Sequence, residues 1–217
     1  MLAELRYLLP GVGWTVGLFL SSALLATVVS LVAGVLSASP RVWLRWPVRG
    51  FIEIFRGTSA LVQLFWVFFV LPMWNINLSA FFAATLVLGL NSGSYGAELV
   101  RGALRAVAHG QKEACRALGL KPWQTLLHVV LPQALFETLP PYGNLLVELL
   151  KNTALASMIG LLEITQRSNE WRNENSEAGP VLIAALLIYF LLALAVSRGV
   201  RGLENRLGAA MHLGEHR

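Results

Sequence analysis

Three long uncharged blocks constrain the fold of this chain more than any other feature. Residues 7–40, 57–97 and 178–197 contain no Asp, Glu, Lys or Arg. A bilayer-spanning helix needs about 20 predominantly apolar residues, so each block can supply one such helix and the second can supply two. The blocks are also too long for the core of a soluble domain. We therefore predict an all-α integral membrane protein, with residues 1–217 forming a single transmembrane domain.

The charge content agrees with a membrane protein. Hydrophobic residues make up 56% of the 217 residues and charged residues only 13%, whereas a soluble domain carries about 25% charged residues. The net charge of +5 comes from cations that lie between the apolar blocks. This placement is typical of membrane-flanking residues and argues against nucleic-acid binding.

Proline and charged residues indicate where the helices end. Pro40 and three following arginines end the first helix, Pro72 ends the second, and Pro140-Pro141 interrupts the fourth. A hydrophilic loop over residues 163–179 precedes the last helix, and a basic tail closes the chain. The first apolar run is too long for a signal peptide, so we expect it to be retained. The five predicted spans are at about residues 12–37, 58–71, 79–104, 133–162 and 180–196.

Lysine and arginine counts predict the orientation of the helices, because cytoplasmic loops are enriched in both residues. One side of the predicted membrane carries only Arg6, Arg167 and Arg172, and Lys151 lies within the fourth span. The other side carries thirteen cations: Arg41, Arg45, Arg49, Arg56, Arg101, Arg105, Lys112, Arg116, Lys121, Arg198, Arg201, Arg206 and Arg217. We therefore predict an extracytoplasmic N-terminus and a cytoplasmic C-terminus.

The polar segment at residues 106–131 is then cytoplasmic. Helix formers fill Gln111–Leu118, and Gly119 suits the position just after a helix, where positive φ is favourable for glycine. Pro122 can start a second helix, which we expect to end before Pro132. By physical argument alone, this segment could equally be an amphipathic connector that lies on the membrane surface.

The residue spacing of the same segment carries a resemblance. Glu113-Ala114-Cys115 is followed by Gly119 after three residues, and Val129-Val130-Leu131-Pro132 comes after nine more. This pattern resembles the EAA loop of permease subunits in bacterial ATP-binding-cassette (ABC) importers. Cys115 stands where that motif has a second alanine, and Val129 where it has isoleucine.

The resemblance extends over roughly residues 12–200. Arg56-Gly57-Thr58, Arg101-Gly102 and Ala117-Leu118-Gly119 are similar to the polar amino-acid uptake family, whose members have five spanning helices. Within that family, residues 55–72 (FRGTSALVQLFWVFFVLP) and 140–155 (PPYGNLLVELLKNTAL) look most like ectoine/hydroxyectoine permease subunits. The family's usual Lys-Asp-Thr-Ser-Leu is replaced here by Lys151-Asn152-Thr153-Ala154-Leu155, which is a departure from the generic amino-acid pattern.

The resemblance implies a division of labour. A cytoplasmic coupling helix with Glu113, Ala114, Cys115 and Gly119 would dock on a separate ATPase dimer, which binds ATP and Mg, so this chain would carry no cofactor. The chain has no Gly-Lys pair and hence no P-loop, so we expect it not to be an enzyme. Further implied partners are a second permease subunit, identical or a sister, and an extracytoplasmic solute-binding protein. The location would be the bacterial inner membrane.

The implied function is uptake of a small zwitterionic solute by alternating access. The resemblance favours ectoine or hydroxyectoine as the solute. The alternative is a polar amino acid such as glutamate, glutamine or a basic amino acid.

Polar residues inside the predicted spans are candidates for the substrate path, because burying them in lipid is costly. Seven residues are candidates, of which the first three share one face of a helix and the next three share another: Asn91, Tyr95, Glu98, Glu148, Lys151, Asn152 and Thr153. An alternative explanation is that Glu148 and Lys151 neutralise each other and that Glu98 lies beside Arg101.

Two other functions are weaker hypotheses. Ser94 could be the nucleophile of an intramembrane hydrolase, but no His or Asp lies in an apolar helix to activate it. A non-transporting scaffold would explain the helices but not the spacing from Glu113 to Pro132.

Overall fold

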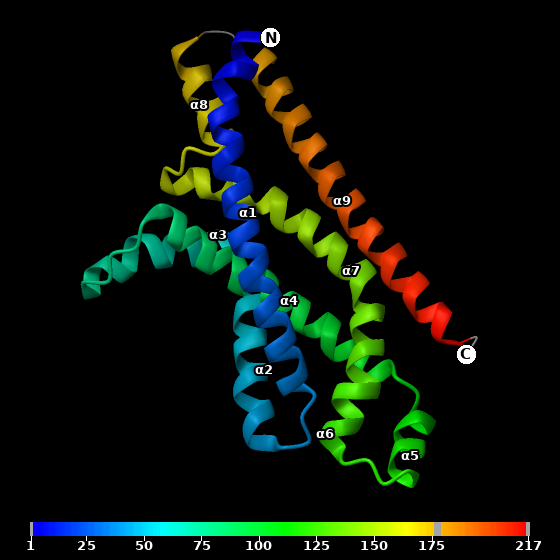
Figure 1. Ribbon diagram of the computed structural model, residues 1–217. Coiled ribbons are helices and arrows are strands. Elements are labelled where there is room, and N and C mark those ends of the chain that lie inside the picture. The colour runs from blue at the N-terminus through cyan, green and yellow to red at the C-terminus, as the bar shows by residue number, and fades with distance from the viewer. Residues whose placement is uncertain (1, 176–178, 216–217) are drawn as a thin grey trace.

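The computed structural model describes residues 2–175 and 179–215, and within these ranges every regular element is helical (Figure 1). The predicted all-α class is therefore confirmed for the described part of the chain. In order, the elements are α1 (Leu2–Ser37), α2 (Val42–Gly57), α3 (Ala60–Phe65), the π-helical turn η1 (Trp66–Val70), the 3₁₀ turn η2 (Leu71–Trp74), α4 (Ala80–Ala106), α5 (His109–Ala117), α6 (Pro122–Thr125), the π-helical turn η3 (Leu126–Val130), α7 (Leu131–Asn152), the 3₁₀ turn η4 (Thr153–Ile159), α8 (Ile164–Glu174) and α9 (Gly179–Glu215).

Helices α1 and α4 form the central contact of the fold. Their backbones approach closely because glycines replace larger residues where the helices cross. A Cβ atom built on Gly93 would lie 2.7 Å from Cβ of Val29, and one built on Gly34 would lie 2.6 Å from Cβ of Val100. Small residues allow membrane helices to pack in this way, so this contact depends on the absence of both side chains.

The remaining long helices pack around this pair. Helix α7 contacts both α4 and α9, and α8 lies against α1 and α9. Leu8, Ile164 and Val181 are fully buried where these last three helices meet. In Figure 1, α8 lies near the N-terminus at one end of the molecule, and α5 and α6 lie at the opposite end. We refer to these as the α8 end and the α5–α6 end.

Two π-helical turns have the same sequence cause. η1 and η3 each end immediately before a Leu-Pro pair, at Leu71-Pro72 and Leu131-Pro132. A proline ring clashes with the carbonyl four residues earlier and cannot donate a hydrogen bond. One wider turn shifts that carbonyl, so the chain stays helical through the proline. The predicted end of a helix before Pro132 was therefore wrong, because the chain continues into α7.

The hydropathy of the described helices supports a membrane protein without establishing the number of spans. Two helices, Arg6–Ser37 and Gly179–Arg206, are long and apolar enough to cross a bilayer. Two bent pairs also qualify if each counts as one span: Val42–Gly57 with Ala60–Trp74 (102°), and Pro122–Ile159 with Ile164–Glu174 (49°). Helix α4, which corresponds to the predicted span at 79–104, is not among them. Five spans and their orientation stay predictions.

Several predicted boundaries were wrong. The fourth helix, predicted over 133–162, ends at Asn152 and continues only as the 3₁₀ turn η4, whereas Pro140-Pro141 bends α7 without ending it. Figure 1 shows α7 changing direction partway along its length. The predicted loop at 163–179 contains α8. Its residues 176–178 lie outside the described part. Helix α9 runs beyond the predicted end at 196.

The segment between the first two predicted spans also forms a helix, α2, which we did not predict. Four arginines and one glutamate interrupt its apolar residues or flank them, so no uncharged block marks it. Its apolar residues nevertheless recur at helical spacing, and Ile52 is fully buried.

Candidate functional site

The first candidate site is the segment that contains α5. Helix α5 ends as predicted, because Gly119 has φ of 75°. The Leu120 amide donates to the carbonyl of Cys115 and the Gly119 amide donates to that of Arg116, both at 3.0 Å. This pair of hydrogen bonds is a Schellman motif, which satisfies carbonyls that a helix end leaves free. The motif gives α5 a sharply defined end and turns the chain towards α6.

The outer surface of α5 is open. Glu113 is exposed and pairs with His109 at 3.1 Å on the preceding turn. Leu118 is 80% exposed, and a Cβ built on Gly119 would meet no atom within 4 Å. Cys115 is instead buried, at 6% exposure, so it holds α5 in place and does not belong to the outer surface. We did not predict Leu118 as a site residue. The sequence signal that could have revealed it is an apolar leucine at the end of a polar helix.

Apolar packing fixes the base of this segment to the helix bundle. Leu104, Val107, Val130 and Ala134 form one buried cluster with Val100 of α4. The Lys112 amine also donates to the carbonyl of Leu104 at 3.3 Å. The clustered residues belong to α4, α7 and the segments next to them, and the Lys112 hydrogen bond joins α5 to the end of α4.

The second candidate site was predicted from polar residues on α4. In the structure, two of these residues hydrogen bond to α2. Asn91 is 8% exposed, and its Nδ2 donates to the carbonyl of Phe55 at 2.8 Å and to Oε1 of Gln63 at 3.4 Å. The Tyr95 hydroxyl donates to the carbonyl of Arg56 at 3.3 Å, and the Arg56 guanidinium lies 5.2 Å from the Tyr95 ring centre. These contacts satisfy carbonyls at the end of α2.

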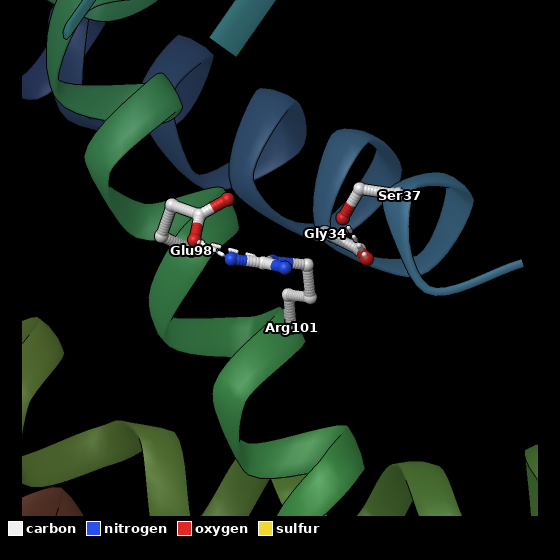
Figure 2. Close-up of polar contacts among 4 residues, drawn as sticks. All are labelled: Gly34, Ser37, Glu98 and Arg101. Carbon is white, nitrogen blue, oxygen red and sulfur yellow. Dashed lines mark hydrogen bonds and ion pairs between the residues drawn. The ribbon is translucent and has the colours of Figure 1, made fainter. Parts of the chain in front are cut away.

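Glu98 is the third residue of the predicted polar face of α4, and its carboxylate pairs with a residue of the same helix. Nε of Arg101 donates to Oε2 of Glu98 at 3.1 Å, and a second guanidinium nitrogen contacts the same oxygen. Figure 2 shows the two side chains directed towards each other beside the end of α1 that carries Gly34 and Ser37. The alternative explanation for Glu98, pairing with Arg101, is therefore confirmed as a contact.

The third group lies where α7 changes into η4. Glu148 and Lys151 are exposed and Asn152 is half-buried. Among the described residues, neither Glu148 nor Lys151 has a hydrogen-bond or ion-pair partner, so the expected mutual neutralisation is not found. Thr153 is fully buried and its hydroxyl donates to the carbonyl of Leu150 at 2.7 Å. No hydrogen bond links this group to Asn91, Tyr95 or Glu98 in the described part of the chain.

A buried carboxyl group at the α8 end was missed. Glu163 is fully buried and accepts hydrogen bonds from the Tyr189 hydroxyl at 2.7 Å and from the Gln166 amide at 2.9 Å. Burial raises the pKa of the Glu163 carboxyl above its ordinary value. Glu163 precedes Gln166 by three residues, which is the spacing of a helix N-cap with its N3 residue, and this signal could have predicted α8.

The arrangement of these helices matches solved transporters. The chain superposes on a crystal structure of an amino acid ABC transporter with histidines with a TM-score of 0.87, at 29% identity and covering 95% of this chain and 96% of the other. An inward-facing structure of the MetNI methionine ABC transporter gives a TM-score of 0.81 at 22% identity, covering 93% and 96%, and it supports the fold alone. The fold is therefore that of an ABC-transporter permease subunit.

Sequence comparison identifies the family. Residues 30–208 match the family described as binding-protein-dependent transport system inner membrane component. A probable amino-acid ABC transporter permease protein, y4tF of Sinorhizobium fredii, is 45% identical over 168 residues, covering 73% of this chain and 71% of that protein. The glutamine transport system permease protein GlnP of Escherichia coli is 37% identical over 183 residues, covering 82% and 84%. The chain belongs to this family of inner membrane components.

Proposed function

We propose that this chain is the permease subunit of an ABC importer that takes up a polar amino acid. The relatives named above are described as amino-acid and glutamine permeases, and an L-cystine permease, TcyB of Bacillus subtilis, is 32% identical over 198 residues, covering 91% of this chain and 85% of that protein. These relatives support the amino-acid alternative among the predicted substrates. Ectoine stays a prediction that depends on residues 55–72 and 140–155 alone.

The observation that carries the proposal is the exposed tip of α5. Leu118 is an apolar side chain with 80% exposure at the end of a short helix, and exposed apolar groups of this kind mark protein contacts when they project from a polar segment. We infer that Leu118 and Glu113 enter a cleft of the ATPase subunit and that Gly119 lets the backbone approach it. Ala114 is exposed on the same helix and is small enough for the same approach.

Coupling follows from the way in which α5 is attached. The buried cluster that contains Leu104 and Val130 joins the segments on either side of α5 and α6 to α4 and α7, and Lys112 of α5 donates a hydrogen bond to the Leu104 carbonyl. When ATP closes the ATPase dimer, α5 moves with it, and α4 and α7 move as rigid helices on either side. This is gating of one bundle against another, which gives alternating access.

We place the amino-acid contacts at the end of α7. Glu148 and Lys151 offer an unpaired carboxylate and an unpaired amine, which complement the ammonium and carboxylate groups of a zwitterion. The adjacent η4 is a break in the helix, and such breaks provide backbone groups to solutes in transporters. Asn91 and Tyr95 have their polar groups engaged with α2, and Glu98 is paired with Arg101. We therefore assign these three residues to positioning the wall of the path.

The complete importer would contain an ATPase dimer, a second permease subunit and an extracytoplasmic solute-binding protein. The solute-binding protein tests the substrate proposal. It is identified from the neighbouring genes and titrated with a panel of amino acids and with ectoine. Tight binding of one amino acid, and ATP-dependent uptake of it by proteoliposomes with all subunits, is the expected result. Binding of ectoine alone would contradict the amino-acid proposal and support the ectoine prediction.

The coupling assignment is tested separately with Glu113→Lys. We expect the variant to co-purify less ATPase and to lose solute-stimulated ATP hydrolysis, because the reversed charge would face basic groups of the ATPase. Glu174→Lys is the matched control, since Glu174 is also exposed but lies on α8 at the other end of the molecule. Unchanged ATP hydrolysis in Glu113→Lys would contradict the assignment.

A further inference from the structure

A large cavity in the bundle plays no part in the proposed transport path. Its volume is about 680 Å³, and it lies among α1, α4, α7 and α9. Helices α1 and α9 are close together near α8 and diverge towards the α5–α6 end (Figure 1). Apolar side chains form most of its wall, among them Leu31, Leu135, Leu139, Leu146, Val200 and Leu203.

The few polar groups in the wall are already hydrogen bonded within the chain. The Thr27 hydroxyl donates to the carbonyl of Ala23 at 2.7 Å, so the Tyr142 hydroxyl donates to Thr27 across 2.9 Å. The Ser30 and Thr138 hydroxyls each donate to a carbonyl of their own helix at 2.6 Å. A polar solute in this cavity would lose its hydration without gaining partners. The cavity therefore suits hydrocarbon and excludes an amino acid.

A helix from another subunit is the other apolar occupant that this cavity could accept. A helix about 10 Å wide that rises 1.5 Å per residue occupies on the order of 120 Å³ per residue. The 680 Å³ of the cavity would therefore enclose less than two helical turns, so a spanning helix would be covered over only part of its length. A flexible hydrocarbon chain can fill such a space along its whole length.

Charged residues next to the lining residues of α9 indicate which kind of hydrocarbon binds in the cavity. Arg201 lies between the lining residues Val200 and Leu203 on α9, and Arg198 lies just before them. Both arginines are exposed, and neither pairs with an acid in the described part of the chain. With the C-terminus in the cytoplasm, as the cation count predicts, these arginines lie at the level of the inner-leaflet headgroups. Juxtamembrane arginines there attract anionic lipids.

We propose that this cavity binds one anionic phospholipid of the cytoplasmic leaflet, with an acyl chain between α1, α7 and α9 and the phosphate at Arg201. The lipid fills the gap between α1 and α9, whereas α7 and α9 already pack directly on each other at Gly143 and Val200. The site depends on the predicted membrane orientation but not on the identity of the transported solute. A lipid site and the substrate assignment can therefore fail independently.

The acyl-chain site is tested by native mass spectrometry of the permease–ATPase complex, purified from a mixture of phosphatidylglycerol and phosphatidylethanolamine. We expect one retained phosphatidylglycerol per permease chain. Leu139→Trp fills the cavity and should lower this retention about tenfold, and Leu203→Trp should do the same. Leu186→Trp is the control, because Leu186 is exposed on α9 and does not line the cavity. Unchanged retention in both cavity variants would overturn the proposal.

The headgroup assignment is tested with Arg201→Gln, and with Arg172→Gln on α8 as the control. We expect Arg201→Gln to lose the preference for phosphatidylglycerol over phosphatidylethanolamine and Arg172→Gln to retain it. An unchanged preference in Arg201→Gln would overturn the placement of the phosphate. A third result would overturn the lipid itself: efficient cross-linking of a Leu139→Cys variant to the second permease subunit would show that protein fills the cavity.

Discussion

Nδ2 of Asn91 on α4 donates a 2.8 Å hydrogen bond to the carbonyl of Phe55 in the last turn of α2. The Tyr95 hydroxyl contacts the next carbonyl, that of Arg56. Two side chains that the sequence pattern assigns to the substrate path therefore cap the C-terminal end of α2. They hold the corner at which the chain bends by 102° between α2 and α3.

We expect Asn91→Ala to lower the free energy of unfolding by about 1 kcal/mol, because a buried amide loses its hydrogen bonds. Gln63 also donates to the Phe55 carbonyl and limits the loss. Thermal unfolding in detergent measures the change, and Asn144→Ala, at an exposed position on α7, should leave stability unchanged. The KM for uptake should be the same in Asn91→Ala as in the wild type. A raised KM with unaltered stability would return Asn91 to the substrate path.

The close contact of α1 with α4 predicts a strong effect at Gly93. Alanine there would place a Cβ atom 2.7 Å from Cβ of Val29, and such overpacking costs about 1–3 kcal/mol. We expect Gly93→Ala to unfold at a lower temperature and to recover in part when combined with Val29→Ala, which removes the Val29 Cγ1 atom that would lie 2.8 Å from the new methyl group. Gly102 lies on the same helix, and a methyl group added there would meet no atom within 4 Å, so Gly102→Ala should be neutral or slightly stabilising. Equal stability of the two single variants would contradict this packing.

The buried Glu163 predicts a pH dependence. Its pKa is raised in the folded protein, so the folded state binds a proton more tightly than the unfolded state. This contribution to stability is fully present below the unfolded pKa, about 4.5, and is lost as pH rises through the folded pKa. The groups that face Glu163 are Tyr189 of α9 and Thr165 of α8.

Glu163→Gln keeps an acceptor for Tyr189 but cannot ionise. The melting temperature of the wild type minus that of this variant should therefore fall as pH rises above 4.5. Melting curves collected across that range measure this difference, and the subtraction removes the effects of all other titrating groups. A difference that is constant, or that grows with pH, would contradict a raised pKa at Glu163.

Local rules were enough to predict the α5 segment. Helix formers over Gln111–Leu118 and a glycine directly after them were enough to predict where the helix ends, and φ of 75° at Gly119 confirms that end. The long uncharged blocks similarly located α1, α4 and α9. In these cases the determining residues are close together in the sequence.

Tertiary contacts decided the features that were missed. The arginines of α2 interrupt its apolar residues, so no uncharged block marks this helix. Its C-terminal carbonyls accept hydrogen bonds from Asn91 and Tyr95 of α4, which lies far along the chain. The sequence around Glu163 is typical of a loop. Only the fold brings the Tyr189 hydroxyl to the Glu163 carboxylate. Pro132 would normally end a helix, but the preceding π-helical turn allows the chain to continue. The capping of α2 and the burial of Glu163 do not follow from nearby residues alone.

The most direct test of the account is ATP-driven amino-acid uptake by proteoliposomes that contain the whole importer, with Leu118→Asp compared with Met73→Asp. Both residues are apolar and about equally exposed, at 80% and 81%, but Leu118 ends α5 whereas Met73 lies in η2. Loss of a contact worth about 2 kcal/mol predicts roughly thirtyfold weaker ATPase binding. We expect Leu118→Asp to lose uptake and ATPase co-purification and Met73→Asp to retain both. Full uptake by Leu118→Asp would contradict coupling through α5.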